Sequence, residues 1–141
     1  MREILFRGKR VDNGEWAYGS LIIETNPFDK DMVMTHIYDN FYNEIIVDPR
    51  TIGQYTGLCD RNGTRIFEGD IVKGVSEYFG NGSLNQKAVV LYDKGQFLLS
   101  FGDTLTECNQ FKDVEVLGAW HDDIEVIGNI HDNLAELEMI E

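Results

Sequence analysis

Cysteines, basic residues and long apolar runs are scarce in this sequence, and each shortage excludes a class of protein. The chain has 141 residues and 2 cysteines, Cys59 and Cys108. They show neither CxxC spacing nor a histidine at zinc-site intervals, which argues against zinc-ribbon and thioredoxin-like folds. We expect two reduced thiols, as is usual in a cytosolic protein.

Apolar runs are short throughout. The N-terminus has three consecutive apolar residues, Ile4 to Phe6, too few for the apolar region of a signal peptide. No other run approaches the length that spans a membrane. We therefore expect a soluble protein that stays in the cytoplasm and has no membrane partner.

Basic residues number 12 against 25 acidic ones, which gives a formal net charge of -13. Because affinity for nucleic acid rests on lysine and arginine, this balance argues against direct DNA binding. Arg2, Arg7, Lys9 and Arg10 cluster near the start but are flanked by acidic residues. We expect a mixed, solvated pair of strands there rather than a basic patch.

Signatures of catalysis are also missing, because the chain has no GxSxG, P-loop, GxGxxG or HExxH motif. His36 lies in a β-like run, Met32 to Tyr38, with no nucleophile beside it, and we expect it to be structural. The sequence predicts neither an enzyme nor a bound cofactor.

What the sequence does contain is short apolar runs of strand length separated by turns. The pattern predicts three hairpins: strands at 4–10 and 15–23 around Asp12-Asn13-Gly14, strands at 54–58 and 65–73 around Asp60-Arg61-Asn62-Gly63, and strands at 87–92 and 96–101 around Asp93-Lys94-Gly95. In the third hairpin we expect the alternating residues to form a half-buried face. These are Val89, Leu91, Phe97, Leu99 and Phe101. Residues 80–83 are predicted to form a further loop.

A helix is predicted only at the C-terminus, where Asn133 can cap the first turn and Glu136 completes a capping-box spacing. Leu134, Leu137 and Ile140 would share its apolar stripe. The length suits one domain. We therefore expect a single domain over 1–141, with an N-terminal hairpin at 1–24, a central β core at 45–101, and C-terminal strands and helix at 111–141.

One pattern recurs after ten residues. Residues 113–118 (DVEVLG) precede His121-Asp122, and residues 123–128 (DIEVIG) precede His131-Asp132. Two neighbouring antiparallel strands of similar pattern are the simpler interpretation. The alternative is that His121, Asp122, His131 and Asp132 project from equivalent turns and bind a divalent metal.

Two other acidic groups invite a functional reading. Glu68 and Asp70 would face the same side of a strand and could act as a carboxylate pair. Gly69 between them favours a bend or bulge instead. The segment at 60–63 lacks the spacing and the closing glutamate of a calcium loop, so it is predicted to be a turn.

Two blocks in the middle of the chain are more specific. The first comprises residues 47–49 (VDP) and 51–58 (TIGQYTGL), and the second residues 66–72 (IFEGDIV), with Asp60, Asn62 and Gly63 between them. Residues 2–4, 6–10 and 14–16, and residues 126–130 with Asn133, agree with the same pattern. Together these segments resemble the YopX family of bacteriophage and prophage proteins over nearly the whole chain. The residues that carry the match include Gln54, Tyr55, Thr56, Gly57, Asn62, Gly63, Glu68, Gly69, Asp70, Gly128 and Asn129.

The resemblance also has gaps. Leu134 stands where a proline is common in the family, and residues 24–44, 74–86 and 102–121 match poorly. The resemblance implies a mainly β fold with SH3-like barrel character, a phage or prophage origin and action in the bacterial cytoplasm. It implies no established activity and brings no catalytic residues.

Three functions from different classes are compatible with these residues. We favour a noncatalytic binding module that forms a homo-oligomer or binds a host or phage protein, because exposed aromatic residues can anchor protein interfaces. The candidate anchors are Trp16, Tyr18, Phe41, Tyr42, Tyr78 and Phe79. The alternatives are an acidic mimic of nucleic acid that inhibits a host DNA-binding protein, and a metal-dependent hydrolase that uses the two His-Asp pairs.

Overall fold

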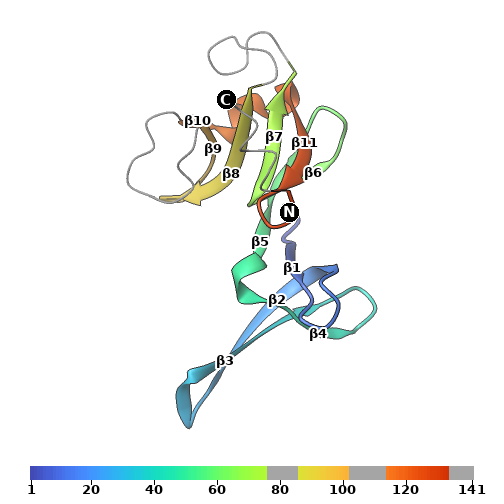
Figure 1. The fold of residues 1–141 in the computed structure, drawn as a ribbon, viewed down its shortest axis with the longest axis vertical. Coiled ribbons are helices and arrows are strands. Elements are labelled where there is room, and N and C mark those ends of the chain that lie inside the picture. The colour runs from blue at the N-terminus through green and yellow to red at the C-terminus, as the bar shows by residue number, and fades with distance from the viewer. Residues whose placement is uncertain (76–85, 102–113, 134–141) are drawn as a thin grey trace. The chain divides into compact units, whose positions relative to one another are not determined.

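The computed structural model describes residues 1–75, 86–101 and 114–133. Contacts within the chain group into two compact units, residues 1–55 and residues 56–141. Each unit has its own antiparallel strands and its own apolar core (Figure 1). The boundary between the units falls inside the central β core that the sequence predicts at 45–101.

The first unit is built on antiparallel strands in the order β4-β3-β2-β1-β5. Their bounds are β1 (Phe6–Lys9), β2 (Trp16–Asn26), β3 (Asp29–Tyr38), β4 (Glu44–Ile46) and β5 (Gly53–Cys59), and a 3-10 turn, η1 (Pro49–Thr51), precedes β5. Strand β5 continues into the second unit, where β6 (Arg65–Phe67) follows it in the sheet order. A small core of Ala17, Ile37 and Val47 holds this unit together.

The second unit contains a five-stranded antiparallel sheet in the order β10-β9-β8-β7-β11. Its elements are β7 (Asp70–Gly74), β8 (Lys87–Asp93), β9 (Gln96–Phe101), β10 (Val114–Val116), α1 (Leu117–Trp120), a 3-10 turn η2 (His121–Asp123), and β11 (Ile124–Asn129). Its core is larger, with seven buried aliphatic residues: Ile66, Val72, Ala88, Val90, Leu99, Leu117 and Ile124.

The three predicted turns are confirmed. Gly14 and Gly63 have positive φ angles of 73° and 82°, and Lys94 and Gly95 have φ angles of 50° and 83°. Two successive positive φ angles, at Lys94-Gly95, are the signature of a tight hairpin turn that matches the right-handed twist of the flanking strands, whereas Asn13 and Asn62 have no positive φ and only the glycine after each does. Asp93 pairs with Gln96, so the turn also fixes the register of β8 on β9.

The mainly β class is confirmed, in the coarser form of two antiparallel sheets and one short helix. The described strands do not close into a barrel, so the SH3-like barrel implied by the family resemblance is not seen among them. Within the described residues, α1 is the only α-helix, and it lies where the sequence predicts the end of a strand. The predicted helix after Asn133 and the loop at 80–83 lie outside the described residues. No helix in the described part of the chain is long and apolar enough to cross a membrane.

The ten-residue echo does not form two neighbouring strands. Its first copy contributes β10, which pairs with β9, and its second contributes β11, which pairs with β7. The two strands therefore lie at opposite edges of the five-stranded sheet. The repeated pattern therefore carries no information about which strand each copy will join.

The predicted face of the third hairpin is wrong on β8. The residue opposite Leu99 is Val90, and Val89 pairs with Ser100. Val90 and Ala88 belong to the core cluster, so they form the inward face of β8. Val89 and Leu91 lie on the opposite face. Ala88, Val89 and Val90 are all buried, and a strand covered on both faces loses the alternation that assigns a face from sequence.

Candidate functional site

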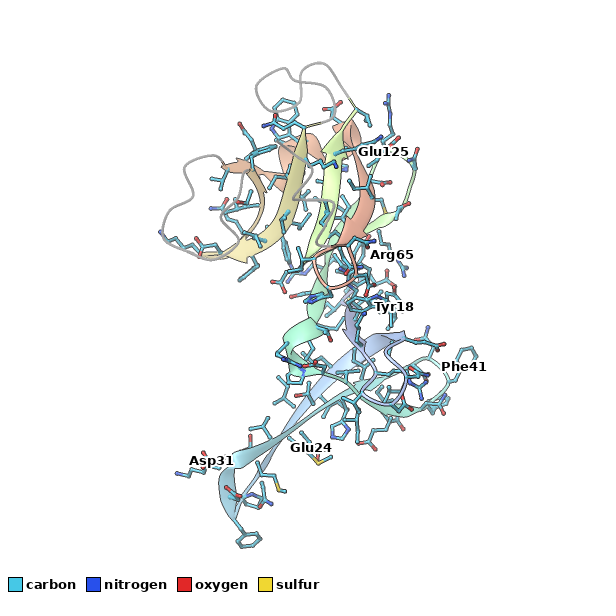
Figure 2. The ribbon with its side chains drawn as sticks, in the orientation of Figure 1. Tyr18, Glu24, Asp31, Phe41, Arg65 and Glu125 are labelled. Atoms are coloured by element: carbon cyan, nitrogen blue, oxygen red, sulfur yellow. The ribbon has the colours of Figure 1, made fainter. Side chains whose placement is uncertain are left out.

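The long hairpin of β2 and β3 is the most exposed β structure in the first unit. Strand β1 pairs with β2 only from Trp16 to Gly19, and β4 pairs with β3 only from His36 to Tyr38. Beyond these residues, among the described strands, β2 and β3 pair with each other alone, from Glu24–Met34 outward to Asn26–Asp29. We call residues 22–34 the hairpin arm. Figure 1 shows the arm reaching beyond the strands that flank its base, and Figure 2 shows Glu24 and Asp31 along it.

The hairpin arm exposes apolar side chains along its whole length. Phe28 at its tip is 96% exposed and Ile23 is 60% exposed. Met32, Val33 and Met34 on β3 are exposed as well. The tip is an ordered turn, because the side chain of Asn26 accepts a hydrogen bond from the backbone N–H of Phe28 at 2.8 Å. The apolar residues are thus held outward by a defined backbone.

A hollow of about 330 Å³ lies beside the first residues of β2 and the loop that follows β3. Trp16, Tyr18 and Phe41 contribute aromatic walls, and Arg10, Glu15 and Asp39 contribute charge. Phe41 (Figure 2) is exposed on the loop between β3 and β4, and so is its neighbour Tyr42. Three of the predicted aromatic anchors therefore gather in one place, while Tyr78 and Phe79 lie outside the described residues.

The loop beside the hollow is organised by Asp39. Its carboxylate accepts hydrogen bonds from the backbone N–H groups of Asn43 and Phe41, each at 2.9 Å, and from the side-chain amide of Asn43 at 3.2 Å. The backbone bond from Asn43 is the main reason that the pKa of Asp39 lies below its ordinary value. Arg10 is held by Asp12, whose pKa the hydrogen bond from Arg10 lowers.

The family blocks serve as structural parts. Asp60 is 5% exposed, and its carboxylate accepts backbone N–H bonds from Asn62, Thr64 and Val126 at 2.8 to 2.9 Å. It therefore ties the predicted turn at 60–63 to strand β11. The turn prediction is confirmed, and the acceptors of this carboxylate are occupied by backbone groups.

The Glu68-Gly69-Asp70 segment is a bend, as predicted. Gly69 has a φ of 91° and separates β6 from β7. Asp70 is 2% exposed and accepts the backbone N–H of Phe67 at 2.7 Å. Its carboxylate closes the bend, an arrangement that places Glu68 in the turn and Asp70 at the first position of β7 rather than both side by side on one strand.

The remaining family residues also stabilise the backbone. The backbone N–H of Tyr55 donates a hydrogen bond to the carbonyl oxygen of Leu5, and the Thr56 hydroxyl donates one to the carbonyl oxygen of Ile66, each at 2.8 Å. Gln54 pairs with Phe6 on β1, and Gly57 has a φ of 87°.

At the other end of the chain, the side-chain oxygen of Asn129 accepts hydrogen bonds from the backbone N–H groups of His131 and Asp132. A Cβ on Gly128 would lie 2.7 Å from the Asn133 side chain, which explains the glycine.

The structure places the predicted metal residues in two separate backbone settings. His121 Nδ1 lies 2.9 Å from the carbonyl oxygen of Cys59 and 3.4 Å from Asp122 Oδ1. Asp132 accepts a bond from the Asn129 side chain at 3.3 Å, in the turn after β11. Within the described residues, these four side chains supply no group of three potential ligand atoms within 4.8 Å of one another.

Sequence reasoning missed the hairpin arm. The strands at 15–23 and 32–38 were expected, but their connection into one long hairpin was not. Asn26-Pro27 is a turn signal that, between two β-like runs, could have revealed it.

The fold and its buried carboxylates define a small antiparallel β protein whose sequence motifs maintain turns. The model of the family described as YopX protein matches residues 5–138. The chain belongs to the YopX family. Protein EF1440 from Enterococcus faecalis, known from a crystal structure, is similar to it with a TM-score of 0.51 and 23% identity, over 97% of this chain and 99% of that one. At that identity the likeness shows the fold alone. No curated protein matches the sequence.

Proposed function

We propose that this protein is a noncatalytic module that self-associates through its hairpin arm. The observation that carries the proposal is the row of exposed apolar side chains on a two-stranded ribbon. An isolated two-stranded hairpin is only marginally stable in water, so a ribbon with apolar side chains gains stability when another surface covers it.

The edges of the arm support a second copy of this chain as the covering surface. Outside the base of the hairpin, β2 and β3 have no further strand beside them among the described residues. Open strand edges accept another strand through their backbone groups. A second arm offers an identical edge, and a two-fold arrangement would use the same residues on both copies.

Charge opposes self-association of this chain. The arm carries three acidic residues and one lysine, a net charge of -2, and the whole chain carries -13. Contact between two arms therefore needs the apolar side chains and strand edges to outweigh a repulsion that salt screens. The same acidity disfavours direct DNA binding, because few cations are available to replace the counterions of a phosphate backbone.

The setting that we propose is a bacterial cytoplasm, with the gene carried by a phage or prophage. Membership of the YopX family supports this origin. The buried carboxylates of Asp60 and Asp70 in the family blocks accept hydrogen bonds from backbone N–H groups. This structural use of the two carboxylates supports a noncatalytic role.

Light scattering coupled to gel filtration, over a wide range of protein concentration, tests the proposal. We expect a dimer or larger species for the natural chain and a monomer for the double variant Ile23→Ser, Val33→Ser. Both residues are exposed, so the variant should remain folded. Val116→Ser, which changes an equally exposed valine on β10, is the matched control and should leave the oligomer unchanged.

Self-association of this acidic chain should strengthen as salt is added, because salt screens the repulsion between the copies. A natural chain that stays monomeric at every concentration and salt level would overturn the proposal. So would an oligomer that is unaffected by the two serine substitutions. In either case, capture of a host or phage protein would become the leading alternative.

A further inference from the structure

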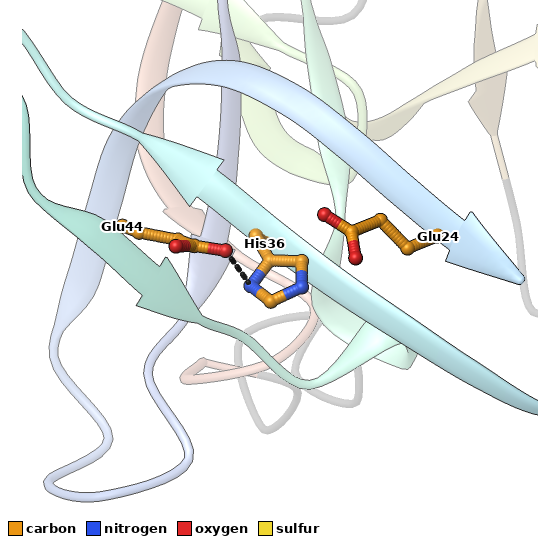
Figure 3. Close-up of side chains that lie close together, drawn as sticks. All are labelled: Glu24, His36 and Glu44. Atoms are coloured by element: carbon orange, nitrogen blue, oxygen red, sulfur yellow. Dashed lines mark ion pairs between the residues drawn. The ribbon is translucent and has the colours of Figure 1, made fainter. Parts of the chain in front are cut away.

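Three titratable side chains gather on one face of the first sheet, at the base of the hairpin arm. His36 lies on the central strand β3, directly opposite Ile22 on β2 and Ile46 on β4. Glu24 is two residues from Ile22, and Glu44 is two residues from Ile46. Because side chains two residues apart on a strand share a face, both glutamates lie on the face of His36. Figure 3 shows the imidazole between the two carboxylates.

The imidazole of His36 is buried and makes no hydrogen bond to the described residues. The residue is 4% exposed, and neither ring nitrogen has a hydrogen-bond partner in residues 1–75, 86–101 and 114–133. Nδ1 lies 3.1 Å from Glu44 Oε1, which is an ion-pair distance, but the approach lacks the angle of a hydrogen bond. Buried polar atoms are nearly always satisfied in native proteins. A species bound at one of its nitrogens would satisfy an imidazole enclosed in this way.

The two carboxylates are placed to share that species. One ligand atom from each of Glu24, His36 and Glu44 lies within 4.8 Å of the other two. In a tetrahedral zinc site the ligand atoms are roughly 3.4 Å apart, as follows from metal–ligand distances of about 2.0 to 2.1 Å. Both glutamates are exposed, so small rotations of their side chains can close this difference.

We propose that Glu24, His36 and Glu44 bind a divalent transition-metal ion, with Zn²⁺ as the best fit. Imidazole nitrogen suits zinc, whereas calcium and magnesium prefer sites made of oxygen alone. The charges of the two carboxylates balance the charge of one Zn²⁺, so the occupied site would carry no net charge. Water would complete the coordination. The ion would join β2, β3 and β4 at the point where the sheet narrows to the two-stranded arm.

The competing explanation is a proton. A protonated imidazole between two carboxylates would also satisfy the buried ring, and it would need no metal. The two explanations differ in what the chain binds, so a direct binding measurement separates them. This inference does not depend on self-association, because all three residues belong to one chain.

Isothermal titration of the chelator-treated full-length chain with ZnCl₂ near neutral pH tests the site. We expect one ion per chain, bound tightly enough to raise the thermal unfolding temperature. His36→Gln and Glu24→Gln should each weaken binding by about 10- to 100-fold or more. His121→Gln is the matched control, because it removes a histidine outside the site and should leave the affinity unchanged. Circular dichroism checks that each variant is folded.

Two results would overturn the proposal. One is the absence of zinc binding by the natural chain, which would leave the protonated imidazole as the explanation. The other is zinc binding that His36→Gln and Glu24→Gln leave intact while His121→Gln removes it, which would move the metal to the second unit. Because Glu24 is exposed, Glu24→Gln keeps the test valid even if His36→Gln fails to fold.

Discussion

At the scale of single residues, Asp60 has the largest structural role among the residues of the family blocks. Its buried carboxylate accepts three backbone N–H groups, one of them from Val126 on β11. The substitution Asp60→Ala leaves these donors without their partner. We expect a loss of about 2 to 3 kcal/mol in the free energy of unfolding, measured by urea denaturation.

The matched control for Asp60 is Asp12→Ala, in the turn between β1 and β2. Asp12 is exposed and bonded to Arg10, so water can replace that partner and the stability should change little. Equal losses at the two positions would contradict the structural role assigned to Asp60.

Asp39 should give the stability of the first unit a dependence on pH. Its pKa is lowered in the folded chain, mainly by the backbone bond from Asn43. A lowered pKa means that the charged carboxylate stabilises the fold at pH values above its unfolded pKa, and that this stability is lost as the pH falls through the folded pKa. Asp39→Asn should therefore lower the urea midpoint at pH 7, and the difference from the natural chain should shrink below the ordinary value of 3.8.

The exposed carboxylate Asp31 on the hairpin arm supplies the control for this titration. Asp31→Asn removes the same charge. Its effect on the urea midpoint should not show the pH dependence expected for Asp39→Asn. A difference between Asp39→Asn and the natural chain that stays constant from neutral to acid pH would contradict the role of the carboxylate charge.

At the scale of single elements, the same substitution should have opposite effects at two glycines. Gly95, in the turn between β8 and β9, has a φ of 83°, which costs an L-residue about 1 to 2 kcal/mol. Gly118 lies in α1 with an ordinary φ, and apart from its chain neighbours and its own helix backbone, no atom of the described residues lies within 4 Å of the position that a Cβ would take. Gly95→Ala should destabilise the chain, and Gly118→Ala should stabilise it by up to about 1 kcal/mol. Urea midpoints that move in the same direction would contradict this assignment.

The elements that could be predicted from sequence are those fixed by local chemistry. The turns at 12–14, 60–63 and 93–95 require positive φ angles that glycine adopts readily, so a few residues determine them. The face of β8 could not be predicted, because Ala88, Val89 and Val90 are all buried and no alternation remains. The positions of β10 and β11 depend on pairing with distant strands, which no local pattern encodes.

The candidate metal site was missed for the same reason. Glu24, His36 and Glu44 are 12 and 8 residues apart in the sequence, and only the register of β2, β3 and β4 brings them together. The two His-Asp pairs attracted attention because they are adjacent in sequence. Proximity along the chain is a weaker guide to which side chains gather than position across three paired strands.

At the scale of the whole molecule, the two separate cores predict two separable unfolding transitions. The first unit has a small core of Ala17, Ile37 and Val47, whereas the second has seven buried aliphatic residues. Each unit contains one tryptophan, Trp16 in the first and Trp120 in the second. Variants with Trp120→Phe or Trp16→Phe therefore report the unfolding of one unit at a time by fluorescence.

Core substitutions then show whether the units are coupled. Ile37→Ala and Leu99→Ala each remove a fully buried side chain at an expected cost of about 2 to 5 kcal/mol. Ile37→Ala should lower the urea midpoint reported by Trp16 and leave that of Trp120 in place, and Leu99→Ala should do the reverse. The first unit should unfold at the lower urea concentration, because its core buries fewer apolar side chains. If either substitution moves both midpoints together, the chain unfolds as one cooperative domain, as its length of 141 residues alone suggests.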